Sequence, residues 1–535
     1  MQYYDLFIKP LLDQPGSTYR HTTLAGAHPM AYWENYNTIL NDPDMCPARP
    51  ALPQEDPKLR ELDTSLLLTG NLRRSYRITK PTLRSEHLRV DMTPLVLQHM
   101  TYAALANSIL QRTGLVRMLW WASEAQKSNV LPPNIRRRRP LDVGLAVGSS
   151  VTEIAGVERL ELDVSAKDRH MRMPGLDGSV QGRVQRRMDE RGQKPPTGRE
   201  MQPSATPPPV EDDPHVTDSI FKTTCTSMTQ LKTALEDFKD YLNKVTKDLK
   251  RLQTMLRTTS RKARIGMDEL IEGLLENVRY QQARNAISSR ASNIYMAGSL
   301  GVQARATLLL DLQARVLNME SEYAAVAELQ PHAEGLHSIR DEILACGEQC
   351  TSLWEMSSNG ARFLKLTLIE DLITGEAQPP TLERDRRAFD PLRAYIEEFW
   401  PQQPLTLLDL VPRSADVSAP GIVDGAEGAR VLQELCKHLF ATPALTVAAS
   451  LERLAPNAGH DLLHQVPEMC DARKGGRLNP HKVRVRMMTT EMMRGLVKAF
   501  LEWPFRPATH ELALQNEGAP DQDLDDFDEG VGEVE

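Results

Sequence analysis

Two clusters of cationic side chains are the clearest candidates for chemistry in this sequence. The first follows a Leu-Pro-Pro segment and consists of four consecutive arginines, Arg136, Arg137, Arg138 and Arg139. Four adjacent guanidinium groups are costly to bury, so they are expected to face either water or a polyanion. Contacts of this kind with several phosphates weaken steeply as salt rises. The cluster predicts contact with a DNA or RNA backbone, and a solvated loop is the alternative.

The second cluster lies near the C-terminus, around a Gly-Gly pair that allows the backbone to approach a ligand closely. Cations then alternate with valines, a spacing that places three cations on one face if the segment is extended. The members of this cluster are Arg473, Lys474, Arg477, Lys482, Arg484 and Arg486. We expect nucleic-acid contact here as well, and an ordinary charged surface is the alternative.

A polar residue also ends a continuous apolar run. Leu66, Leu67 and Leu68 lead into Thr-Gly and then into Asn71 and Leu72. Such a run is typical of a buried parallel strand whose carboxyl end opens onto a ligand crevice. Asn71 is therefore a candidate for contacting a ligand in that crevice, or simply a polar strand end.

A second apolar strand carries the pair Trp120 and Trp121. Because neighbouring residues of a strand point to opposite faces, at least one of these rings is expected in the core. Stacking of the other ring on an unpaired base is the alternative.

Other chemistries lack their residue patterns. The six Cys are scattered without a CxxC pair, which fits a reduced compartment and excludes a disulfide framework or a zinc site. The thirteen His form no HExxH motif, and neither a GxSxG motif nor a Walker loop is present. We therefore expect no catalytic residue, no metal and no cofactor in this chain. No window approaches 18 consecutive apolar residues, so no membrane span is expected.

The charge of the chain is unevenly distributed. The segment 517–535 holds nine acids and no base, and subtracting these from the net charge of −8 leaves +1 for the rest. Residues 511–535 are predicted to be a disordered acidic tail, which is either a solvated end or an autoinhibitory mimic of nucleic acid.

The elements that would position these residues begin with an α/β domain at 1–164. Its expected order is helices near 3–12 and 33–40, a strand at 65–70, a helix at 92–112 and a strand at 114–121. A strand, a long helix and a second strand form a βαβ crossover in a parallel sheet. Residues 165–216, which are basic and then Pro-rich, are predicted to be a disordered linker.

A helical insertion is expected at 217–357, because apolar residues recur there at alternating spacings of four and three, typical of a coiled-coil seam. Similar patterns at 309–326 and 339–353 predict three helices that pack on each other as a bundle or as antiparallel hairpins, with Cys346 and Cys350 as core residues. The seam of the first helix consists of Leu231, Leu235, Phe238, Leu242, Val245, Leu249, Leu252 and Leu256.

Residues 358–383 are predicted to be a linker, and residues 384–510 a C-terminal α-helical domain. Its helices are expected near 391–400, 426–440 and 489–503, with an apolar connector at 404–410.

Several motifs, in their order along the chain, resemble the mitochondrial transcription factor B family in its fungal form. This family of mitochondrial RNA polymerase specificity factors is related to the rRNA adenine-N6 dimethyltransferases. The match covers roughly residues 1–160 and 384–507. The motifs that carry it are Asp63–Leu72, Gln111–Leu119, Leu131–Arg139, Arg386–Phe389, Leu405–Asp409, Asp471–Pro480 and Ala499–Phe505.

The resemblance implies a Rossmann-like methyltransferase fold, here expected to lack its cofactor-binding N-terminal strands. No Gly-rich loop for S-adenosylmethionine precedes the strand at 65–70, so this cofactor follows from family descent only. The strand tip reads Asn71-Leu72-Arg73-Arg74, and the Pro and aromatic ring of an adenine pocket are missing.

The implied function is non-catalytic: to bind mitochondrial RNA polymerase and melted promoter DNA, with rRNA as a further partner. Mitochondrial localisation also rests on the resemblance, because Met1–Asp13 shows no targeting peptide. The alternatives are an S-adenosylmethionine-dependent rRNA adenine-N6 dimethyltransferase and a coiled-coil scaffold protein.

Overall fold

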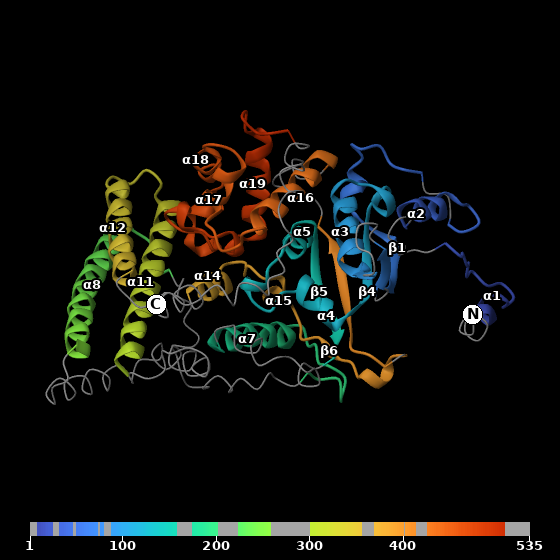
Figure 1. The fold of residues 1–535 in the computed structure, drawn as a ribbon, viewed down its shortest axis with the longest axis horizontal. Helices are drawn as coiled ribbons and strands as arrows, with labels where there is room; N and C mark the ends of the chain where they lie inside the picture. Colours follow the sequence, from blue (N-terminus) through green and yellow to red (C-terminus); the bar gives the residue numbers. More distant parts are fainter. Residues whose placement is uncertain are drawn as a thin grey trace.

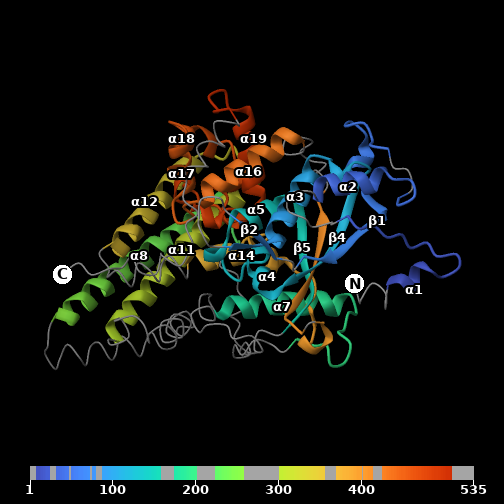
Figure 2. The ribbon, with the colours of Figure 1, turned by 45° about the vertical axis from the view of Figure 1, so that its right-hand side comes forward.

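The computed structural model of the chain has three parts (Figure 1). A mixed α/β part and a bundle of long helices lie at opposite ends, and C-terminal helices lie between them in both views (Figures 1 and 2). The structure describes residues 8–24, 32–46, 50–72, 75–79, 87–157, 174–201, 223–257, 300–355, 369–400, 402–413 and 425–508. The predicted acidic tail at 511–535 lies outside these residues.

The α/β part is built on a five-stranded sheet of order β1-β4-β7-β5-β6. β1 and β4 pair in parallel, as predicted, and β7 lies antiparallel between β4 and β5. β1, β4, β5 and β6 therefore all run in one direction, with β7 as the single reversed strand. The strands are β1 (Leu62–Asn71), β4 (Leu115–Ser123), β5 (Ser149–Gly156), β6 (Leu392–Arg393) and β7 (Leu405–Pro412).

Two expectations for the segment 391–410 are wrong. The predicted connector at 404–410 is the central strand β7, and the predicted helix at 391–400 is replaced by β6 and the short 3-10 helix η7 (Ile396–Glu398). Leu408 and Leu410 are fully buried, because both point into the apolar core between the sheet and its covering helices. The sheet therefore takes strands from both the predicted α/β domain and the predicted C-terminal domain.

One face of the sheet is covered by helices. Alternate residues of β4, including Met118 and Trp120, pack there against α2, α3 and α5 in a single apolar core. The helix predicted at 92–112 ends earlier, at Leu105, and is followed by the 3-10 helix η3. The helices on this face are α2 (Tyr32–Asn41), α3 (Met92–Leu105), α4 (Glu124–Val130) and α5 (Pro140–Gly148).

The helical insertion forms the predicted three-helix bundle. Its helices are α8 (Met228–Arg257), α11 (Leu300–Leu329) and α12 (Leu336–Glu355), and all three share one apolar core. Cys346 and Cys350 lie in this core, as the periodicity predicts. Of the predicted seam, Leu231, Leu235, Phe238, Leu242, Val245 and Leu249 are buried, and the side chains of Leu252 and Leu256 lie outside the described residues.

Both predicted linkers contain helices. α7 (Pro174–Glu190) occupies much of the basic linker and buries Leu176, Val180, Val184 and Met188, which recur every four residues. The second linker contains α14 (Glu370–Glu376), whose Ile373 belongs to the core of the bundle. Charge and proline content concealed these apolar positions, so both linker predictions are wrong where the helices lie.

The C-terminal part is helical, and the helices predicted at 426–440 and 489–503 are present. They pack on α5 through Val143 and Val147, so this part and the α/β part share a core. The four helices are α16 (Ala426–Phe440), α17 (Val447–Leu454), α18 (Ala458–Leu463) and α19 (Thr490–Glu502).

Three further observations concern residue patterns. None of the six Cys forms a disulfide bond. In the part of the chain that the structure describes, no helix is long and apolar enough to cross a membrane. Within the same residues, no group of three or more His, Cys, Asp or Glu side chains is arranged to hold a metal ion.

Candidate nucleic-acid interface

Asn71 and Trp121 lie side by side at the carboxyl edge of the sheet. The register of β1 and β4 pairs these two residues, so both side chains point to the face that lies opposite the helix-covered one. Asn71 is exposed and Trp121 is half-buried. In sheets of parallel strands, ligands bind at this carboxyl edge.

The preceding pair, Gly70 and Trp120, points to the covered face. A Cβ at Gly70 would lie 2.7 Å from a ring carbon of Trp120, so glycine leaves room for that ring. Leu72 is buried beside it, and its carbonyl accepts a hydrogen bond of 3.2 Å from the Thr93 hydroxyl. Leu72 is therefore a core residue rather than the wall of an open base pocket, and only Asn71 of the predicted remnant faces solvent.

Two aromatic rings from a distant part of the sequence lie near this edge. The ring of Phe399 meets the ring of Trp121 edge to face, with centroids 5.2 Å apart. Trp400 follows directly and is 77% exposed. The rings reach the carboxyl edge because β7 begins there at Leu405 and its neighbour Pro404 accepts a hydrogen bond from the Glu124 amide (3.1 Å).

The segment that carries these rings is held in place by ion pairs and cation–π contacts. Arg199 binds both carboxylate oxygens of Glu398, and its guanidinium lies 5.3 Å from the centre of the Tyr395 ring. Arg393 lies 4.8 Å from the same ring. Hydrogen bonds from Arg199 to Glu398 hold the pKa of this exposed carboxyl at about 2, so the pair is charged at neutral pH.

The uncovered face continues beyond the rings. Leu67 is 53% exposed. The Arg117 side chain, which pairs with Asp409 of the neighbouring strand β7, is 47% exposed. Alternate residues of the edge strand β1 are thus open to solvent, and apolar, polar and cationic side chains of β1 and β4 share this face.

The four consecutive arginines do not act as one exposed cluster. Arg138 is buried, lies 3.2 Å from the Asp142 carboxylate and donates to the backbone carbonyls of Arg486 and Met488. The expectation that all four face solvent or phosphate is wrong for Arg138, which has carboxylate and carbonyl partners in the interior. Arg136 and Arg137 are half-buried in the 3-10 helix η4 (Ile135–Arg137), and Arg139 is exposed at the start of α5.

The second cationic cluster lies against acidic side chains of other helices. Arg477 donates to both oxygens of Glu320 on α11 (2.9 and 2.8 Å). Arg473 pairs with Glu328, which lies further along the same helix (2.8 Å). Lys482 pairs with Glu348 of α12 at 2.6 Å. Arg484 and Arg486 both bind Glu370 of α14, at 3.1 and 2.5 Å.

These ion pairs correct the prediction for the cluster. The segment Lys482–Arg486 is not one extended strand, because 3-10 helices η10 (Pro480–Lys482) and η11 (Val485–Met487) bend it. Arg477 and Arg486 are largely buried, and their charges join the C-terminal part to the helical insertion. Lys474, with 49% of its side chain exposed and Glu468 at 3.9 Å, is the most accessible member.

The candidate binding residues predicted from the sequence did not include Phe399, Trp400 and Tyr395. Their order, Tyr-Ile-Glu-Glu-Phe-Trp, reads as a helix, and nothing in it indicates a position beside Trp121. The signal that would have found them is the apolar run at 405–411: once it is assigned to a strand, the residues before it fall at an edge of the sheet.

The comparisons with known proteins add no relative. No protein-family model matches the chain, and no curated protein and no solved structure matches it. The fold and the site therefore define a class, a mixed α/β protein with an added helical bundle and an aromatic surface at the carboxyl edge of its sheet.

Proposed function

We propose that this protein is a non-catalytic, methyltransferase-like factor that binds an unpaired nucleic-acid strand. In the wider proposal it is a mitochondrial transcription initiation factor, which acts with mitochondrial RNA polymerase at melted promoter DNA. The observation that carries the binding proposal is the position of Trp121 and Phe399 beside Asn71 at the carboxyl edge of the sheet.

The arrangement of the sheet supports a methyltransferase-like fold. Four strands run in one direction, and the reversed strand β7 is inserted between β4 and β5. This mixed, mostly parallel order is compatible with the α/β methyltransferase-like fold that the resemblance implies. β1 is an edge strand of this sheet, and it carries the exposed apolar side chains of Leu62 and Leu67.

The aromatic edge supports recognition of unpaired bases. Stacking of a base on an aromatic ring contributes about 1–3 kcal/mol and needs no particular base, because every base has a π-face. Trp400 offers a ring that is 77% exposed, and Asn71 offers an amide that can donate to and accept from a base edge.

The same residues favour binding over methyl transfer. Leu72, which follows the Asn of the predicted adenine pocket, is committed to the core and leaves no ring at that position for clamping an adenine. Binding therefore needs no methyl donor, and S-adenosylmethionine is not part of the proposed mechanism.

The binding proposal is tested by fluorescence anisotropy with a labelled single-stranded oligonucleotide and with the matching duplex. We expect preference for the single strand and a loss of affinity of about tenfold or more in both Trp121→Ala and Trp400→Ala. Phe505→Ala is the matched control, because Phe505 is an equally exposed ring (74%) in the C-terminal part. Equal binding of single strand and duplex, with no effect of either Trp variant, would refute the proposal.

The wider function is tested by run-off transcription with the cognate mitochondrial RNA polymerase at two salt concentrations. Stimulation on a closed duplex promoter, and little on a pre-melted one, is the expected result. Loss of stimulation in Trp400→Ala but not in Phe505→Ala would connect it to the aromatic edge. If the protein binds single strands but does not change transcription, the binding proposal stands and the role in transcription initiation is excluded.

A further inference from the structure

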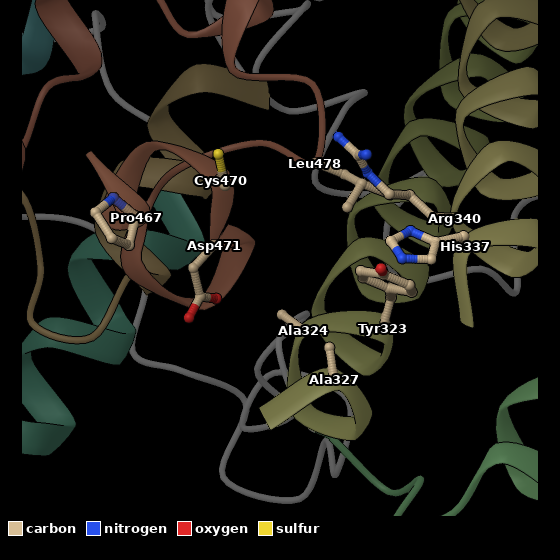
Figure 3. Close-up of a pocket in the computed structure, with 9 residues that line it drawn as sticks. All are labelled: Tyr323, Ala324, Ala327, His337, Arg340, Pro467, Cys470, Asp471 and Leu478. Carbon is tan, nitrogen blue, oxygen red and sulfur yellow. The ribbon is translucent and has the colours of Figure 1, made fainter. Parts of the chain in front are cut away.

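An open cavity lies where the helical bundle meets the C-terminal part, far along the chain from the aromatic edge. Its volume is about 320 Å³, within the range of small-molecule sites. One wall comes from α11 and α12 and the other from the 3-10 helix η8 (Pro467–Cys470) and the residues that follow it (Figure 3). The lining residues are Tyr323, Ala324, Ala327, His337, Arg340, Pro467, Cys470, Asp471 and Leu478.

Arg340 distinguishes this cavity. Its side chain extends from α12 across the opening toward Cys470 (Figure 3). In the described ranges, no carboxylate pairs with the Arg340 guanidinium and no hydrogen bond involves its side chain, although the residue is half-buried. The neighbouring cations at the same junction are all paired, Arg473 with Glu328, Arg477 with Glu320 and Lys482 with Glu348.

The charge of Arg340 reaches both walls. Burial raises the pKa of the Tyr323 hydroxyl and of the Cys470 thiol, and the positive charge of Arg340 lowers both to a smaller extent. Both groups therefore stay protonated at neutral pH and remain hydrogen-bond donors.

Asp471, the acid that lines the cavity, is already paired with an arginine. Asp471 accepts two hydrogen bonds from its neighbour Arg473 (3.0 and 2.8 Å) and a third from the Arg473 backbone amide (2.9 Å). Among the residues that line the cavity, Arg340 is therefore the cation whose charge faces a polar opening without a paired carboxylate. The remaining walls are apolar or aromatic, with Ala324, Ala327, Pro467 and Leu478 among them.

We propose that this cavity binds a small organic anion, with its carboxylate or phosphate on Arg340 and its apolar body against Ala324, Ala327 and Pro467. Tyr323 and Cys470 supply further donors. The ligand would bridge the helical insertion and the C-terminal part, and the site is independent of nucleic-acid binding at the sheet edge.

The test is isothermal titration calorimetry on the full chain with two probes of the same shape, 1-naphthoate and the uncharged naphthalene-1-carboxamide. We expect 1-naphthoate to bind with a stoichiometry of one and the carboxamide to bind at least tenfold more weakly. Inorganic phosphate, which lacks an apolar body, is expected to compete only at much higher concentration.

Two variants locate the site. Arg340→Gln should lower the affinity for 1-naphthoate at least tenfold, and Ala327→Phe should fill the cavity and abolish binding. The matched control is Arg430→Gln, since Arg430 is an exposed arginine on α16. Unchanged circular dichroism and melting temperature show that a variant has folded. Equal binding of the two probes, retained affinity in Arg340→Gln, or no saturable binding of 1-naphthoate would each overturn the proposal.

Discussion

Arg477 binds Glu320 through two parallel hydrogen bonds of 2.9 and 2.8 Å, although 157 residues separate the two in the sequence. Both side chains are nearly buried, with 11% and 6% of their surfaces exposed. The Leu478 amide donates a third bond to the same carboxylate (3.1 Å). This pair ties the helical insertion to the C-terminal part, and it explains why a cation expected to face phosphate lies inside the protein.

Removing one partner of this pair should be costly. Glu320→Ala leaves the Arg477 charge buried and uncompensated, and we expect a loss of about 3–5 kcal/mol in the free energy of unfolding. Chemical denaturation measures this loss in the free energy of unfolding. Lys239→Ala, which breaks the half-exposed pair with Glu342, is the control and should cost less than about 1 kcal/mol. A similar loss in the two variants would contradict the structural role of the buried pair.

Asp142 should make stability depend on pH in an unusual direction. Burial raises the pKa of Asp142 from its ordinary 3.8 to about 6, despite the opposing charge of Arg138. The folded state thus holds the proton more tightly than the unfolded state. This contribution to stability is complete below pH 3.8 and is lost as the pH rises through 6.

The corresponding experiment compares the unfolding free energy of the natural chain with that of Asp142→Asn across this range. The difference between the two should fall by on the order of 3 kcal/mol as the pH rises from about 4 to about 6. A difference that stays constant across this range would show that Asp142 does not titrate there.

Gly70 should tolerate no larger residue. Gly70→Ala places a methyl group 2.7 Å from the buried ring of Trp120, so we expect a loss of about 1–3 kcal/mol in stability. Gly182→Ala is the opposite case, because nothing lies within 4 Å of the new Cβ on α7, and it should stabilise by about 0.5–1 kcal/mol. Thermal unfolding of both variants measures whether stability falls in Gly70→Ala and rises in Gly182→Ala.

The cysteines should react with iodoacetamide in two groups. Cys46 and Cys470 are partly exposed and should be modified in the folded chain, Cys470 more slowly because burial raises the pKa of its thiol. Cys225, Cys346, Cys350 and Cys436 are buried. Burial also raises the pKa of the Cys436 thiol far above its ordinary value and that of Cys225 to about 11, which removes the reactive thiolate. Mass spectrometry of the folded chain should therefore find the second group unmodified until denaturant is added.

Local periodicity determined a large part of this structure. The seam from Leu231 to Leu249, the helices at 426–440 and 489–503 and the parallel pair of strands that includes Leu68 and Met118 follow from the spacing of apolar residues alone. Apolar side chains must be removed from water wherever they occur, so their spacing fixes the type of element and its buried face.

Tertiary structure decided which neighbours those elements have. The strand at 405–412 inserts between β4 and β5, and only this pairing brings Phe399 next to Trp121. Tertiary structure also decided which cations are buried. Arg477 and Arg486 lie in a cationic run that looks exposed, and their carboxylates come from distant helices. Arg138 has its carboxylate nearby in Asp142, but the carbonyls of Arg486 and Met488 that it also binds come from the C-terminal part. A charge becomes buried only when a partner compensates for its lost hydration, and that partner is set by the packing of the chain rather than by the local sequence.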